Sequence, residues 1–400
     1  MHPWKGLQGL PRAVWLISIS TLVNRLGTMA LPFLVLYLTE ARRWTPGEAG
    51  TAMAVYGLGA FTAAPFAGRL ADRLGHARVL RASLWLSGTA LLVLPLVSVR
   101  LFLLPLIFLW AGFTQAFWPS AMALITSLVA PEQRKAAFAL HRGAVNLGMA
   151  VGPAVGGLIA HASYAWVFWT DGLSTLASAL LLTWLLGRSE PAPAPGAMGE
   201  ASSPWRDRRL RWILLGTLPA MLVFFQIEGP YPLWVVRDLG HSTRFFGLIF
   251  TLNTLLIVAF EVALNLAMAR WPHGRALALG CLCYALGFGL TGLAHGRGAL
   301  LGLAAVWTAG EMILLPTASD AVAGLAPAAR RGEYMGLYAL MFATALALGP
   351  WLGVKGYARF GPGWVWAGCA ACGLLSALVL WPFHLDKPVA AVTPSGTEEA

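Results

Sequence analysis

The chain has 400 residues, of which 58% are hydrophobic and only 11% charged, and its formal net charge is +11. Soluble domains carry about 25% charged residues, so this composition excludes a water-soluble globular protein and makes lipid the solvent for most of the chain. The apolar runs are long and unbroken rather than alternating, which excludes a transmembrane β-barrel.

The apolar runs predict twelve membrane-spanning helices, since each span needs about 20 residues. The predicted spans, in chain order, are 14–38, 48–69, 79–98, 101–125, 143–161, 165–187, 212–236, 245–270, 276–294, 299–324, 334–357 and 363–384. The first run is too long for a signal peptide and lacks a small-residue cleavage site, so we interpret it as the first span. The predicted fold class is an all-α membrane protein.

One long polar interruption divides the spans into two sets of six. It is rich in Pro, Gly and charged residues, a composition that cannot cross lipid and is typical of a linker. The predicted domains are an N-terminal bundle at 1–187, a cytoplasmic linker at 188–211, a C-terminal bundle at 212–384 and a disordered cytoplasmic tail at 385–400.

The two halves resemble copies of one another at an offset of 197 residues. The landmarks that coincide are Arg12 with Arg209, Trp15 with Trp212, Gly50 with Gly247, Trp110 with Trp307, Pro119 with Pro316, Gly152 with Gly349 and Pro153 with Pro350. Parallel six-helix repeats are the architecture of transporters whose substrate site lies between the repeats.

The distribution of basic residues predicts the orientation. With both termini in the cytoplasm, 19 of the 28 Lys and Arg lie in cytoplasmic segments, eight lie outside, and Arg25 lies within the membrane. This asymmetry follows the positive-inside rule and explains the net charge without nucleic-acid binding. We expect a monomeric, multi-pass protein of a bacterial inner membrane, whose partners are the lipid bilayer, protons and a small-molecule substrate.

A basic turn lies between the second and third predicted spans, at 68–78. Its characteristic residues are Gly68, Asp72, Arg73, Gly75 and Arg78. At this spacing the turn resembles the loop between the second and third helices of the major facilitator superfamily. The resemblance implies a twelve-helix transporter fold in which Asp72 and Arg73 help to latch the two halves together on the cytoplasmic side.

A run of small residues in the fifth predicted span carries a second motif. It comprises Gly148, Gly152, Pro153, Gly156 and Gly157. Small residues at every fourth position allow close helix packing, and Pro153 bends the span. The run is similar to the fifth-helix signature of drug:proton antiporters in the same superfamily, which implies export. The fourth span departs from that branch, since no Arg stands at 108–112.

Five polar side chains within the spans are candidates for substrate or proton binding in addition to Arg25. They are Asn24, Gln115, Glu228, Glu261 and Glu311. Intramembrane charges are costly and normally face a partner or a water-filled cavity. In the family the first, fourth, seventh and tenth helices line the cavity, which favours Glu228 and Glu311 as proton sites with Arg25 as their partner. The alternative for each acid is a structural ion pair or hydrogen bond.

Several motifs of soluble enzymes are either absent or misplaced. The chain has no Walker A sequence, and the GxGxxG string at 287–292 lies inside an apolar span. Its two cysteine pairs lie in apolar helices without nearby His or acids, so we expect no metal site. We predict no enzymatic activity and no cofactor, and a proton gradient is the expected energy source.

These features together predict a secondary active transporter that exports an amphipathic small molecule in exchange for protons by alternating access. Three alternatives stay open. The chain could import an anionic metabolite with protons or by facilitated diffusion, with Arg25 as the anion site; it could flip a lipid-like substrate; or it could be a membrane sensor that transports nothing.

Overall fold

The computed structural model of the protein describes residues 9–130, 133–186, 204–268, 270–327 and 330–383. Helices fill nearly all of this part, and it contains no strand. The first-half helices are Arg12–Gly27 (α1), Ala30–Leu36 (α2), Pro46–Leu74 (α3), His76–Val93 (α4), Arg100–Gln115 (α5), Phe117–Leu128 (α6), Arg134–Ala162 (α7) and Tyr164–Leu186 (α8). The second-half helices are Arg208–Phe224 (α9), Pro230–Pro232 (α10), Thr243–Ala267 (α11), His273–Gly289 (α12), Arg297–Leu325 (α13), Arg331–Phe360 (α14) and Pro362–Leu380 (α15).

Short turns of 3₁₀ or π helix extend or join several of these helices. They lie at Tyr37–Ala41 (η2), Leu94–Leu96 (η3), Pro204–Arg206 (η5), Phe225–Glu228 (η6), Leu233–Asp238 (η7) and Leu290–Leu293 (η8). Such turns break two predicted spans, and Ala116 alone divides the fourth predicted span into α5 and α6. The first span consists of α1, α2 and η2, and the seventh consists of α9, η6, α10 and η7.

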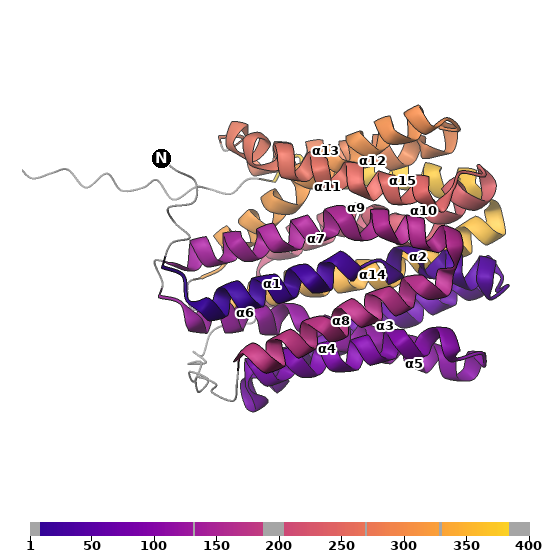
Figure 1. The fold of residues 1–400 in the computed structure, drawn as a ribbon. Coiled ribbons are helices and arrows are strands. Elements are labelled where there is room, and N and C mark those ends of the chain that lie inside the picture. The colour runs from indigo at the N-terminus through magenta and orange to yellow at the C-terminus, as the bar shows by residue number, and fades with distance from the viewer. Residues whose placement is uncertain (1–8, 131–132, 187–203, 269, 328–329, 384–400) are drawn as a thin grey trace, which may run out of the picture.

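The helical stretches run side by side along the long axis of the molecule, one for each predicted span (Figure 1). Within the described residues, eleven of them are long and apolar enough to cross a membrane. The other stretch, α3, has 29 residues and at 1.5 Å per residue also exceeds a hydrocarbon core of about 30 Å. The all-α, twelve-helix prediction is confirmed.

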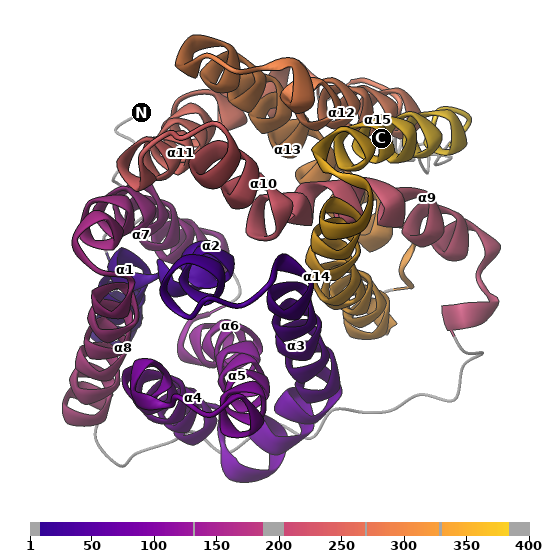
Figure 2. The same cartoon turned by 90° about the vertical axis from the view of Figure 1, so that its right-hand side faces the viewer.

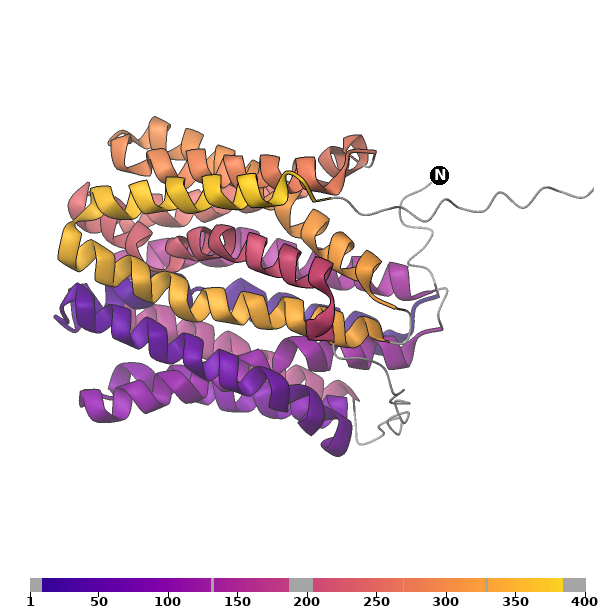
Figure 3. The ribbon, with the colours of Figure 1, turned by 180° about the vertical axis from the view of Figure 1, so that it is seen from behind.

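The helices pack as two bundles related by the sequence repeat. In the first half α1 packs on α7, α3 on α5, and α4 on α8; in the second half the equivalent pairs are α9 with α14, α11 with α13, and α12 with α15. Two equivalent seams join the bundles, one between α7 and α11 and one between α3 and α14 (Figure 2). From behind, α14 lies beside α9 along the surface of the second bundle (Figure 3).

Packing around the repeated glycines matches the repeat. Gly50 of α3 lies against Val354 of α14, and Gly247 of α11 lies against Pro153 of α7, so both glycines occupy a seam between bundles. A Cβ added at Gly50 would come within 3.1 Å of the Val354 side chain. The π turns η2 and η7 also fall at equivalent positions in the repeat. The two halves therefore share local geometry as well as sequence landmarks.

The predicted basic turn at 68–78 is nearly all helical. Residues 68–74 form the last turns of α3, and α4 begins at His76, so Gly75 alone reverses the chain. Its φ of +95° is readily adopted only by glycine, which is why one residue suffices. The side chain of Asp72 lies outside the described part of the structure, whereas Arg73 and Arg78 are exposed.

We name the two ends of the molecule by the helices that begin or end there. The terminal end is the one at which α1 begins and α3 and α15 end, and the far end is the one at which α3 begins and α14 ends. The predicted tail at 385–400 lies outside the described residues. So does most of the predicted linker at 188–211, of which the last residues form η5 and the start of α9.

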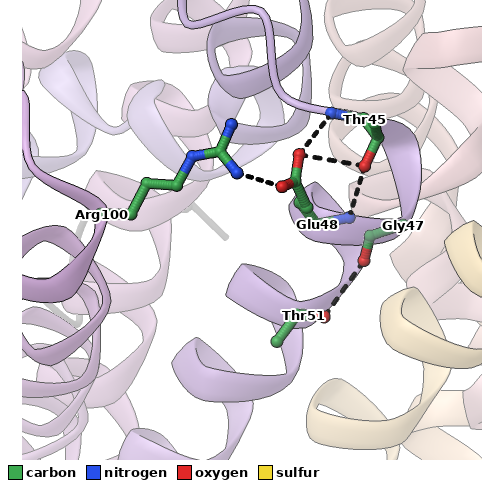
Figure 4. A network of polar contacts seen from close by, with 5 residues as sticks. All are labelled: Thr45, Gly47, Glu48, Thr51 and Arg100. Atoms are coloured by element: carbon green, nitrogen blue, oxygen red, sulfur yellow. Dashed lines mark hydrogen bonds and ion pairs between the residues drawn. The ribbon is translucent and has the colours of Figure 1, made fainter.

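A polar network fixes the start of α3 at the far end (Figure 4). Thr45 and Glu48 form a capping box, in which the Thr45 amide donates to Glu48 Oε2 at 2.8 Å and the Glu48 amide donates to Thr45 Oγ1 at 3.3 Å. Glu48 also forms an ion pair with Arg100 of α5. This network sets the helix end that carries Gly50 into the α3–α14 seam.

Candidate transport site

The break in the first spanning helix lies beside a buried carboxylate. Pro32 has no amide proton and its ring obstructs the carbonyl four residues earlier, which accounts for a break near Thr28. The free amides of Met29 and Ala30 donate to Asp171 Oδ2 of α8, at 3.2 and 3.0 Å. Gly27 makes this possible, since a Cβ there would collide with Ser174 of α8. Asp171 therefore caps α2.

Arg25 lies in the last turn of α1, directly before this break. Its side chain is half-buried, its guanidinium lies 5.6 Å from the centroid of the Phe117 ring, and its Nε has no hydrogen-bond partner. Asp171, Tyr56 and the buried His141 of α7 interact with it electrostatically. Since Asp171 is already occupied with two amides, Arg25 retains donors for another group.

The break in the seventh spanning helix carries Glu228. Pro230 and Pro232 obstruct the helix there as Pro32 does in the first half, and Gly229 between them and η6 adopts φ −124° and ψ −100°. Glu228 is half-buried, and its Oε2 has no hydrogen-bond partner. Tyr56 of α3 interacts electrostatically with both Glu228 and Arg25. The two charges thus come from different bundles, and each has an unpartnered polar atom.

Glu311 lies on α13 and faces α11 within the second bundle. Its Oε2 accepts a hydrogen bond of 2.8 Å from Asn253, which also donates to Thr308 at 3.2 Å. Arg25 is not among the groups that interact electrostatically with Glu311, nor among those that interact with Glu228. The structure places Glu311 with an amide rather than with the predicted arginine.

Glu261 lies on α11 near the terminal end. It forms an ion pair with Arg142 of α7, so this pair connects the two bundles. Both side chains line a cavity of about 830 Å³ between α7 and the second bundle. One turn further along, Asn265 of α11 donates to the carbonyls of Glu261 and Met312.

The other two predicted site residues lie in the first bundle. Asn24 is buried and donates to Thr175 Oγ1 of α8 at 2.9 Å, so it joins α1 to α8. Gln115 is half-buried at the end of α5, where the chain turns into α6. Among the described residues, no group of three His, Cys, Asp or Glu could hold a metal ion.

The small-residue motif of α7 packs as two faces. Gly148 and Gly152 lie against Arg25 and Leu26 at the end of α1, and Gly156 lies against Met29. Gly157 instead lies against Thr243 and Gly247 of α11, and Pro153 is the residue whose carbonyl approaches Gly247. This motif therefore holds both the break in the first helix and the seam between bundles, which is the close packing that small residues permit.

A family comparison agrees with this architecture. The sequence model of the Major Facilitator Superfamily matches residues 17–242 and 213–400, which together span nearly the whole chain. The chain belongs to the major facilitator superfamily. It is accordingly a secondary transporter of small molecules and not an enzyme.

Curated relatives of this facilitator transporter have diverse names. A Na⁺, Li⁺, K⁺/H⁺ antiporter of Planococcus maritimus is 23% identical over 91% of the chain and 94% of that protein. The multidrug resistance protein MdtH of Cronobacter sakazakii is 24% identical over 88% and 89%. The class C tetracycline resistance protein of Escherichia coli is 30% identical over 61% of the chain and 64% of that protein.

Solved structures show the same fold at lower identity. A POT family transporter in complex with 5-aminolevulinic acid has a TM-score of 0.77 at 18% identity, and the match covers 96% of this chain and 98% of that one. A D-xylose–proton symporter has a TM-score of 0.72 at 16% identity over 93% and 97%.

Sequence reasoning missed three residues that the facilitator fold brings to these acids. Tyr56 interacts electrostatically with Arg25 and Glu228, Asn253 binds Glu311, and Arg142 pairs with Glu261. Asn253 carried a usable signal, since an amide in the middle of an apolar span normally faces a polar partner. Arg142 carried none, because it counted among the basic residues that set topology.

Proposed function

We propose that this protein exports an amphipathic small molecule in exchange for protons, by rocking its two bundles around the region of Arg25, Tyr56 and Glu228. The observation that carries the proposal is the pair of half-buried opposite charges, Arg25 and Glu228, which come from different bundles and have unpartnered atoms. An acid at a broken helix between two moving bundles is suited to take up a proton in one state and release it in another.

The orientation in the proposal places the terminal end in the cytoplasm. The positive-inside rule supports this orientation, since the basic residues around Gly75 and Arg208 lie at that end and Lys and Arg are enriched in cytoplasmic segments. The α3–α14 seam makes its close contacts in the far half, where Gly50 lies against Val354 and Gly57 against Ala347. These contacts support an arrangement that is closed to the outside and open toward the cytoplasm.

Export is favoured by the α7 motif and by the names of the relatives. The motif glycines pack against the break beside Arg25, as expected if they transmit movement between the site and the α7–α11 seam. Two of the relatives are named for multidrug and tetracycline resistance. Both observations concern direction and substrate class and leave the individual substrate open.

A second candidate is proton-coupled import of an anionic metabolite. It is favoured by Arg25, whose guanidinium has donors left for an anion. Counterflow in vesicles of known orientation separates the candidates: export requires uptake into inverted vesicles when a proton gradient is imposed.

The experiment that tests the proposal follows proton movement in inverted vesicles. Ethidium, tetracycline and Na⁺ are added separately to energised vesicles that contain the wild-type protein or Glu228→Gln. We expect ethidium or tetracycline, but not Na⁺, to dissipate the pH gradient, and Glu228→Gln to abolish that response because it cannot release a proton. Glu48→Gln, at the far-end capping box, is the matched control and keeps the response. A response to Na⁺ alone would establish inorganic cation exchange instead.

A further inference from the structure

The cavity beside Glu261 is separate from the region around Arg25, since no residue of α1 lines it. It is lined by α7 on one side and by α11, α12 and α13 on the other, all in their terminal halves. An ion pair joins Arg142 with Glu261 in it, and a hydrogen bond of 2.9 Å joins His273 Nε2 with Asp320 Oδ2. The Arg142–Glu261 pair lies within the spanning helices, whereas His273 is the first residue of α12.

An apolar stripe follows the same cavity along α11. Leu255, Val258, Val262 and Leu266 recur at helical spacing, and each is more than half exposed. From the first to the last, the stripe covers about 16 Å at the helical rise, which is about half the thickness of the hydrocarbon core. A molecule with an apolar body could lie on this stripe without leaving one leaflet.

The charges favour a cation as the polar part of such a molecule. With His273 neutral, the cavity contains one base, Arg142, and two acids, Glu261 and Asp320, so its formal charge is −1. Glu261 is the fixed partner, since its side chain is only 13% exposed, whereas that of Arg142 is 61% exposed. An incoming cation could replace the exposed arginine at Glu261 more easily than an anion could replace the buried glutamate.

We propose that this cavity is a lateral binding site that takes an amphipathic cation from the inner leaflet, with Glu261 binding its charged group in place of Arg142. The proposal rests on the proposed function for its orientation and deepens it by naming a substrate class and an entry site. Binding also affects the seam. Once Glu261 exchanges its partner, the terminal half of the α7–α11 seam loses its ion pair, and the hydrogen bond from Thr254 to the Met149 carbonyl remains near the middle of the seam.

Three fluorescent probes with one apolar body test the charge requirement. Trimethylammonium-diphenylhexatriene is cationic, diphenylhexatriene is neutral, and its propionic acid derivative is anionic. Each is titrated into phosphatidylcholine nanodiscs that contain the purified full-length protein. The chain has 18 tryptophans, and Trp271 lines the cavity, so the part of the tryptophan energy transfer that is lost in Trp271→Phe reports binding there. We expect saturable transfer with the cationic probe and about tenfold weaker binding of the other two, the equivalent of about 1.4 kcal/mol.

Substitutions of the two members of the ion pair should shift the affinity for the cationic probe in opposite directions. Glu261→Gln removes the cation's partner, so affinity for the cationic probe falls about tenfold while affinity for neutral diphenylhexatriene stays unchanged. Arg142→Gln removes the competitor and raises affinity for the cationic probe. The matched control is Glu48→Gln, which alters an Arg–Glu pair at the opposite end and leaves all three affinities unchanged. Melting temperatures of the variants, and Glu261→Asp as the conservative replacement, verify that the fold is intact.

Equal binding of the three probes, or weaker binding of the cationic probe in both Glu261→Gln and Arg142→Gln, would overturn the lateral site, because the pair would then serve the fold alone. These titrations need no transport. If the probes bind as expected but no compound moves protons in vesicles, the lateral site stands and the exporter proposal fails. If transport is proton-coupled but binding is not charge-selective, the exporter proposal stands and the lateral site fails.

Discussion

The two broken helices occupy equivalent places in the repeat but are stabilised differently. In the first half, Asp171 of α8 accepts from the two amides freed at the break. The residue at the equivalent position of the second half is Gly368, which has no side chain to offer. There the Gln226 amide instead donates to the carbonyls of Leu222 and Gly349, at 2.7 and 2.9 Å. A cavity of about 280 Å³, lined by Gln226, Gly349 and Gly368, lies where the carboxylate would be.

This contrast indicates that Asp171 stabilises the structure, whereas Glu228 is available for transport. The first break uses its acid as a cap, and Ser20 and Asn24 continue the polar contacts between α1 and α8 by binding Ser178 and Thr175. The second break is closed by a neutral amide. Its acid, Glu228, has an unpartnered oxygen and caps no helix. We infer that the first break is the rigid one and that the second is the one that responds to protons.

The largest predicted effect concerns the cap at the first break. Asp171→Ala leaves the amides of Met29 and Ala30 buried without an acceptor, and each such donor costs about 1–3 kcal/mol. We expect the free energy of unfolding, measured by denaturant titration in detergent, to fall by about 3 kcal/mol. Asp171→Asn keeps a carbonyl oxygen and should recover much of the loss. Equal stability of the alanine variant and wild type would show that the cap is dispensable.

A smaller loss is expected at the second break. Gln226→Leu removes the donors to Leu222 and Gly349 but leaves only carbonyls unpaired, so we expect the free energy of unfolding to fall by about 1–2 kcal/mol. The matched substitution in the same cavity is Gly368→Ala, which has no atom within 4 Å of its added Cβ and should cost nothing. If Gly368→Ala lowered the free energy of unfolding as much as Gln226→Leu, the packing of the cavity rather than the Gln226 hydrogen bonds would determine the stability of this break.

The sequence predicted the positions of the helices far better than it predicted which side chains of different helices interact. Long apolar runs and the 197-residue repeat were sufficient for the twelve-helix fold, because span length is set by bilayer thickness. The prolines that break the first and seventh spans were visible, yet the apolar runs around them still predicted continuous helices. Arg25 and Glu228 were recognisable as costly intramembrane charges. Their relation through Tyr56 was not, because it depends on which faces of α1, α3 and η6 meet.

The smallest predicted effect on stability is that of Glu228→Gln, and it best distinguishes the role of Glu228 from that of Asp171. Glu228→Gln removes a charge that caps no helix and has an unpartnered oxygen, so we expect the free energy of unfolding to change by less than about 0.5 kcal/mol or to rise slightly. The same variant is expected to abolish proton-coupled transport, whereas Asp171→Asn should lose stability and retain coupling. Measuring unfolding and proton flux on both variants therefore separates the two roles. If Glu228→Gln proved as destabilising as Asp171→Ala, Glu228 would be a structural group, and the asymmetry between the two breaks would have no bearing on transport.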